Sequence, residues 1–193
     1  MFEYIEGKIV ELTPTYLVLD NNQIGYFINV SLNTYSEISE KQISKIFIHQ
    51  VIKEDSNTLF GFSSPDEREI FRHLITVSGI GANTARMMLS SLNPSELQTA
   101  ISTENVNALK SIKGIGAKTA QRVIIDLKDK ITKTQVSDQI FAQSVNNSRE
   151  EALSALVMLG FNKKPAEKVI DKLIKQNGES SVEELIKKSL NEL

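Results

Sequence analysis

The stretch SIKGIGAKTAQRV contains residue types that can bind a phosphate group. Gly114 and Gly116 stand one residue apart, directly before a helical pattern. A glycine turn lets an outside group approach the main chain, and the helix that follows presents free N–H groups and the positive end of its dipole. Lys118 and Arg122 lie four residues apart on one helix face, and Thr119 adds a hydroxyl donor. Together these residues predict an anion site that suits one phosphate.

The same turn occurs 35 residues earlier, in TVSGIGANTARMM. Its glycines are Gly79 and Gly81, and its candidate side-chain donors are Asn83, Thr84 and Arg86. Because Asn83 stands where the later copy has a lysine, this site should depend more on main-chain N–H groups. Contacts to phosphates carry little sequence information, so the pair predicts recognition of duplex shape, with two hairpins gripping both strands across a minor groove.

Two other glycine motifs do not fit these turns. A P-loop needs the pattern G-x-x-x-x-G-K-S/T, which the chain lacks. The dinucleotide-binding motif needs a strand before the turn and a small residue at the positions that Thr84 and Thr119 occupy. The alternative that each glycine pair only turns one helix into the next stays open at this point.

Charge is distributed unevenly, although the formal net charge is only −2. Residues 1–63 hold four bases and eight acids, whereas residues 64–135 hold ten bases and seven acids. Seven of those bases fall within residues 110–133. A local basic face is the electrostatic signature of a phosphate-bearing partner, and a solvated helix face is the alternative.

The amino-acid composition excludes or disfavours several other kinds of site. The chain has no cysteine and two histidines far apart in sequence, which excludes disulfides and thiolate metal sites and disfavours a histidine metal cluster. The lack of cysteine suits a reducing compartment. No apolar run approaches the roughly 18 residues that span a bilayer, and the start MFEYIEGKIVEL has acids where a signal peptide carries positive charge. We therefore expect a cytoplasmic protein with no metal, cofactor or membrane partner.

The hydrophobic pattern must supply elements that position the two glycine turns. Residues 1–63 contain five short stretches rich in β-branched and aromatic residues, which predicts a small barrel, with the five-stranded OB type fitting the count. Residues 64–133 change to a helical period. Ser64 and Glu67 predict a capping box at the first of these helices, and Ser102–Thr103 predicts the start of a later one.

The C-terminal third of the chain has two patterns. Residues 134–147 are polar and weakly periodic, which predicts a flexible linker. Residues 148–193 contain three helical patterns and predict a small three-helix bundle, with Ser148 and Glu151 as the capping box of its first helix.

In this order, the barrel, the EDSNTLFGFSS stretch, the tandem Gly-Ile-Gly hairpins and the LVMLGF segment resemble the RuvA family of Holliday-junction-binding subunits. The resemblance covers nearly the whole chain. It implies an α+β, multi-domain fold: an OB-type barrel for tetramerisation (1–63), a tandem helix-hairpin-helix DNA-binding domain (64–133), a flexible linker (134–147) and a UBA-like three-helix bundle (148–193).

The resemblance also implies roles for residues outside the hairpins. Glu54 and Asp55 match an acidic pin at the junction centre, where carboxylates repel DNA phosphates and help to separate strands. Leu156, Leu159 and Phe161 match the surface that binds the RuvB motor. The alternatives are an ordinary polar β-turn for the first pair and bundle core for the second group.

The function implied is non-enzymatic. A homotetramer, or two tetramers face to face, would bind a four-way DNA junction, hold it open and recruit the RuvB ATPase for branch migration in recombination and repair, with the RuvC resolvase as a further partner. Two alternatives remain. One is a nuclease or glycosylase that uses the hairpins for DNA grip, for which Glu54 and Asp55 are the one tempting carboxylate pair. The other is a protein-interaction scaffold.

Overall fold

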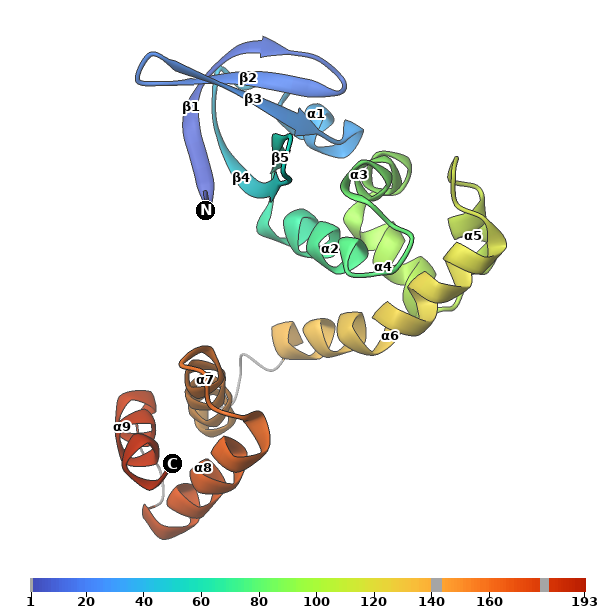
Figure 1. Cartoon of the computed structure of the whole chain (residues 1–193). Helices are drawn as coiled ribbons and strands as arrows, with labels where there is room; N and C mark the ends of the chain where they lie inside the picture. The colour runs from blue at the N-terminus through green and yellow to red at the C-terminus, as the bar shows by residue number, and fades with distance from the viewer. Residues whose placement is uncertain (1, 140–143, 178–180) are drawn as a thin grey trace. The chain divides into compact units, whose positions relative to one another are not determined.

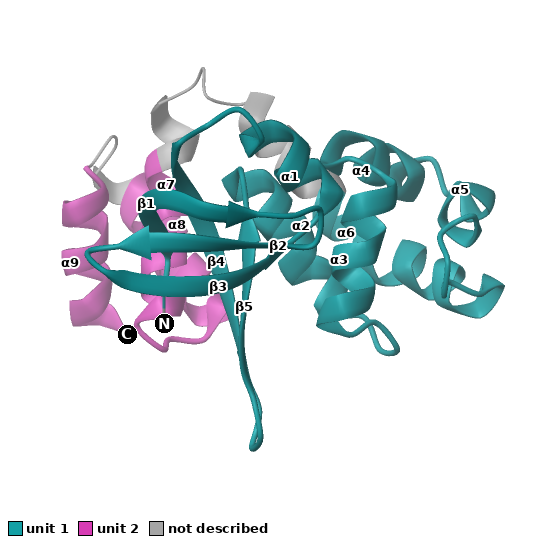
Figure 2. Cartoon of the chain, turned by 90° about the horizontal axis from the view of Figure 1, so that it is seen from above, with its two compact units in different colours: residues 1–133 teal, residues 134–193 magenta. Residues whose placement is uncertain are grey.

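The computed structural model describes residues 2–139, 144–177 and 181–193 (Figure 1). The chain forms two compact units, residues 1–133 and residues 134–193, coloured separately in Figure 2. Within the described ranges, no helix is both long and apolar enough to cross a membrane.

Five strands of the first unit close into a barrel in the order β1-β2-β3-β5-β4. They are β1 (Tyr4–Leu12), β2 (Tyr16–Asn21), β3 (Ile24–Val30), β4 (Ile43–Ile52) and β5 (Asn57–Phe62). Pairing is antiparallel except between β3 and β5, which run parallel. Leu17, Leu19, Ile28, Ile46 and Ile48 fill the interior without exposed surface. The five-stranded barrel predicted from the strand pattern is confirmed.

A short helix, α1 (Leu32–Ile38), interrupts the barrel between β3 and β4 and was not predicted. Ser31 is its N-cap, and the Ser31 side chain accepts a hydrogen bond from the Thr34 N–H. Seven residues are too few for a helical period to stand out from the neighbouring strand pattern.

Helices of the hairpin block build a second apolar core beside the core of the barrel. They are α2 (Pro65–Ile75), α3 (Ala82–Ser91), α4 (Pro94–Ser102), α5 (Val106–Lys110) and α6 (Ala117–Gln139). Phe60 and Phe62 of β5 pack on Phe71 of α2, with ring centroids 5.2 and 4.9 Å apart. The last strand and the hairpin helices thus share one apolar cluster, which couples the hairpins to the barrel.

The predicted capping box at α2 is only half present. The Ser64 hydroxyl accepts from the Glu67 N–H at 3.2 Å, as expected of the cap. The Glu67 carboxylate turns away from the cap and is fully buried. It accepts hydrogen bonds from the hydroxyls of Ser31 (2.5 Å), Thr34 (2.6 Å) and Ser63 (3.3 Å). The physical reason is that α1, absent from the prediction, supplies two of these donors, so Glu67 ties α1 to α2.

Three other helix boundaries differ from prediction. Asn105, not Ser102–Thr103, caps α5 by accepting from the Ala108 N–H at 3.0 Å. The segment expected as a linker is helical over 134–139, and α7 begins at Ser144, so Ser148 lies inside that helix and not at its cap. Residues 117–159 contain no glycine or proline, so nothing in the main chain forces the helices to stop where polarity rises. The rest of the expected linker, 140–143, lies outside the described residues.

The second unit is a three-helix bundle, as predicted. Its helices are α7 (Ser144–Met158), α8 (Lys163–Asn177) and α9 (Val182–Glu192), with Ser181 capping α9. Its described core consists of Ala152, Leu153, Leu156, Ala166, Ile170, Leu173 and Leu185.

Candidate nucleic-acid interface

The two Gly-Ile-Gly turns have the same main-chain geometry. Gly79 and Gly114 adopt positive φ angles of +94° and +88°, in the left-handed region that glycine enters without steric cost. In both copies the isoleucine that follows, Ile80 or Ile115, is buried. Its N–H donates to the carbonyl oxygen three residues earlier at 3.0 Å. The repeat in sequence is therefore a repeat in structure.

The second glycine of each turn leads into a helix whose first N–H groups are bare. Gly81 is the N-cap of α3, with extended backbone (φ −87°, ψ 169°) and no side-chain capping bond. The first helical bonds run from Ala85 N to the Gly81 oxygen and from Ala120 N to the Gly116 oxygen, each 2.9 Å. The amides before Ala85 and Ala120 have no partner within their helices. Such N–H groups bind anions readily.

Space around the glycines is open. A Cβ built on Gly79, Gly81 or Gly116 meets no atom within 4 Å. Gly81 and Gly116 also lack a positive φ, so neither conformation nor internal packing requires glycine at these two positions. All four turn glycines are exposed. Glycine at these two positions instead allows a group from outside the chain to approach the main chain closely.

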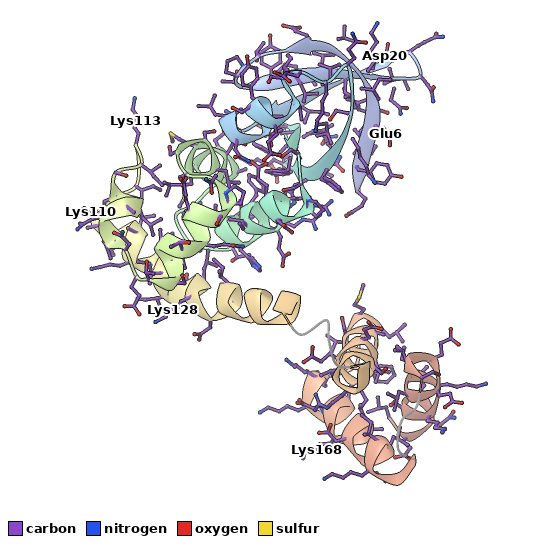
Figure 3. The ribbon with its side chains drawn as sticks, turned by 180° about the vertical axis from the view of Figure 1, so that it is seen from behind. Glu6, Asp20, Lys110, Lys113, Lys128 and Lys168 are labelled. Atoms are coloured by element: carbon purple, nitrogen blue, oxygen red, sulfur yellow. The ribbon has the colours of Figure 1, made fainter. Side chains whose placement is uncertain are left out.

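Side chains around the second turn add positive charge. Lys118 is exposed and Thr119 is half-buried, and Asn83 and Thr84 have the same exposure in the first copy. Lys113, directly before Gly114, is also exposed and extends away from the ribbon in Figure 3. Lys113 was predicted as part of the basic stretch but not as a residue of the site. Its position next to the glycine was the available signal.

Arg86, which was predicted to bind phosphate, has hydrogen-bond partners on the barrel. Its guanidinium Nη1 donates to the Thr15 carbonyl oxygen at 2.8 Å and to Asn29 Oδ1 at 3.2 Å. Burial lowers the pKa of this arginine. Arg86 therefore ties α3 to the barrel, and its role in binding phosphate stays a prediction. The sequence pattern did not indicate these contacts, because Thr15 and Asn29 are far from Arg86 along the chain and meet it only in the folded protein.

The two turns contact each other reciprocally. Arg122 of α6 reaches the first turn, where Nη1 lies 3.4 Å from the Ser78 carbonyl oxygen. Met87 of α3 reaches the second turn, with Cε 3.8 Å from a Cβ built on Gly114. Met87 and Arg122 are 35 residues apart and hold the same position in the two copies. The two copies thus pack as a symmetric pair. Arg122, which is predicted to bind phosphate, also makes a contact between the two hairpins.

Glu54 and Asp55 lie at the tip of the β4–β5 hairpin. Both are exposed, in a tight turn closed by a 2.8 Å bond from Lys53 N to the Ser56 oxygen. Figure 2 shows this hairpin extending beyond the rest of the barrel. The two carboxylates are thus presented far from the barrel core.

Comparisons with known proteins agree with this geometry. Family models match along the chain: the RuvA N terminal domain at residues 1–61, a SAM-like helix-hairpin-helix tandem at 71–129 and the RuvA C-terminal domain at 147–193. A protein of Christiangramia forsetii named "Holliday junction branch migration complex subunit RuvA" is 51% identical, and the match covers 100% of both chains. The chain belongs to the RuvA family. Proteins of the same name from Flavobacterium psychrophilum and Bacteroides thetaiotaomicron are 49% and 50% identical, again over 100% of both chains.

The C-terminal residues that the RuvA resemblance singled out form a helix-ending motif. Gly160, with φ of +99°, follows the end of α7. Its N–H donates to the Val157 oxygen at 3.0 Å, and the Phe161 N–H donates to the Leu156 oxygen at 3.1 Å. This is the Schellman arrangement, which usually brings the two outer apolar residues into contact. Leu156 is fully buried and Phe161 packs against the same core. Leu156 therefore supports the bundle from inside, and its direct contact with a partner stays a prediction.

Three consecutive residues at the end of α7 present the apolar surface instead. Val157, Met158 and Leu159 are 42%, 86% and 61% exposed. We call these three the α7 end patch. Of the predicted RuvB-binding residues, only Leu159 belongs to it. Met158 and Val157 were not predicted as part of this surface, although Met158 falls on the side of the helix opposite to Leu153 and Leu156.

Proposed function

We propose that this protein binds four-way DNA junctions through its two glycine turns, holds them open and recruits an ATP-driven RuvB motor for branch migration in recombination and DNA repair. The observation that carries the proposal is the pair of exposed glycine corners, similar in geometry, whose helix N-terminal amides have no partner within their own helices. Named relatives are subunits of a Holliday junction branch migration complex, which supports the same function.

The physical argument begins with the phosphates. Each corner offers helix N-terminal amides to one phosphate, and Lys118, Lys113 and Arg122 add charge beside the second corner. Because the hairpins pack as a symmetric pair, they can bind phosphates of the two strands of one duplex arm. Recognition of this kind follows duplex shape and not base sequence, which suits a protein that must act wherever a junction forms.

One chain carries one such pair of hairpins, whereas a junction has four arms. We infer a homotetramer, or two tetramers face to face, assembled through the barrel domain (1–63) with the hairpin domain (64–133) on each arm. Glu54 and Asp55 would then act as the acidic pin at the crossover. Their carboxylates repel the phosphates and favour separated strands.

The three-helix bundle (148–193) would dock the motor through the α7 end patch, with Leu159 as a direct contact. Exposed apolar residues in a group mark partner sites. ATP hydrolysis would belong to the motor, and the chain itself would be non-catalytic and act in the bacterial cytoplasm. The RuvC resolvase would approach the same junction.

A gel-shift comparison tests the proposal. The full chain should bind a four-way junction more tightly than linear duplex of the same sequence, and incubation with Mg²⁺ should leave a labelled junction uncut. Equal affinity for the two DNAs would overturn junction specificity. Cleavage without a partner would instead support the enzyme alternative.

A further inference from the structure

Met158 is the most accessible of the methionines that the structure describes. It is 86% exposed, whereas Met87 is 37% exposed and Met88 is fully buried. The Schellman bonds at Gly160 and Phe161 fix the main chain around it, so this exposure belongs to an ordered helix end. An accessible thioether is the form of methionine that oxidants attack most readily.

We propose that Met158 is an oxidation site that switches docking of the motor on and off. The inference rests on the proposed docking function. Hydrogen peroxide transfers one oxygen atom to the thioether sulfur: an S–O bond forms, the peroxide O–O bond breaks and water leaves. The sulfur loses two electrons and the peroxide gains them. The product, methionine sulfoxide, is polar where the thioether was apolar, and reductases of the methionine sulfoxide class can reverse the step.

The surroundings of Met158 explain why one oxygen atom would matter. Its neighbours in the α7 end patch, Val157 and Leu159, offer no hydrogen-bond donor from their side chains. A sulfoxide oxygen that a partner covers there loses its water without gaining a donor, which weakens binding. The same oxidation should leave the fold intact, because the bundle core is built from Leu153, Leu156 and their neighbours and not from Met158.

The test uses the full chain before and after treatment with hydrogen peroxide, with oxidised positions mapped by mass spectrometry. We expect Met158 to oxidise before Met87. Affinity for the cognate motor ATPase should fall about ten-fold, the order expected for burying one unsatisfied polar group. Affinity for a four-way junction should not change, and the helical circular dichroism should be retained.

Two variants make the result specific. Met158→Leu should have the same motor affinity before and after peroxide, whatever its starting value, whereas Met87→Leu should lose affinity as the unmodified chain does. Met158→Gln should bind weakly without any peroxide. Equal motor binding before and after oxidation of Met158, or an equal loss in Met158→Leu, would overturn the inference. No motor binding by the untreated chain would overturn the docking function itself, and the inference with it.

Discussion

The Arg122 guanidinium lies 3.4 Å from the Ser78 carbonyl oxygen, so a side chain of the second hairpin holds the turn of the first. In the opposite direction, Met87 of the first hairpin lies beside the second turn, with its Cε 3.8 Å from a Cβ built on Gly114. The two copies of the repeat, 35 residues apart in sequence, contact each other in matching ways, and these contacts set the distance between the two glycine turns.

Lys118→Ala should weaken junction binding and make it less sensitive to salt. Lys118 is exposed beside the second corner, and each lost phosphate contact lowers the slope of log affinity against log salt by about 0.9. Lys128→Ala on the same helix is the matched control, because Lys128 is ion-paired with Glu104. Titrations at several salt concentrations measure both slopes. An unchanged slope for Lys118→Ala would remove it from the interface.

Arg86→Ala should reduce stability and leave the salt slope of DNA binding unchanged. The substitution removes hydrogen bonds to the barrel residues Thr15 and Asn29, and should lower the free energy of unfolding by about 1–3 kcal/mol. Urea denaturation measures the change in stability, and salt titration measures the slope of DNA binding. A lower slope with full stability would return Arg86 to the phosphate site.

Glu67→Gln should destabilise the first unit by about 1–3 kcal/mol. The hydroxyls of Ser31 and Thr34 donate to the two carboxylate oxygens, and an amide offers an N–H₂ group to one of these donors. Glu69→Gln, an exposed change on the same helix, serves as the control. Equal denaturation midpoints for the two variants would mean that the buried network contributes little.

Stability should fall in mild acid because of His49. Burial, together with the charges of Arg72 and Arg68, lowers the pKa of His49 below its ordinary value of 6.5. The fold therefore favours the neutral ring, and the unfolded chain takes up the proton first as pH drops. The stabilisation is complete above about pH 6.5 and declines below it. Denaturation midpoints between pH 7.5 and 5.5 should show this decline, and His49→Gln should flatten it.

Local features of this fold were predictable from sequence, and contacts across the fold were not. Both glycine corners follow from Gly79 and Gly114 and from the helical patterns around them, all within one stretch of chain. The partner of Arg86 is Thr15, 71 residues earlier, and no spacing rule indicates it. Glu67 has the right spacing for a capping box. Its carboxylate instead accepts hydrogen bonds from residues at the start of α1, a helix that the sequence pattern did not reveal.

The C-terminal motif shows the opposite case, in which a readable signal was missed. Leu156, Gly160 and Phe161 have the spacing of a helix-ending Schellman motif, which predicts that the outer two residues pack together. Packing of this kind places Leu156 in the core and leaves Met158 exposed, as the structure shows.

Alanine substitutions at the turn glycines distinguish an effect on stability from an effect on DNA binding. Gly79→Ala should lower stability by about 1 kcal/mol, because its φ of +94° strains any residue with a Cβ. Gly81→Ala and Gly116→Ala have no such strain and no clash within the chain.

The most direct test is the junction affinity of the double variant Gly81→Ala, Gly116→Ala, measured beside its thermal stability. Two added methyl groups should leave the melting temperature unchanged or slightly higher, while junction binding falls by at least about ten-fold, because the phosphates can no longer reach the amides. Full affinity in a stably folded double variant would contradict the account, since the corners would then not be where the DNA backbone binds.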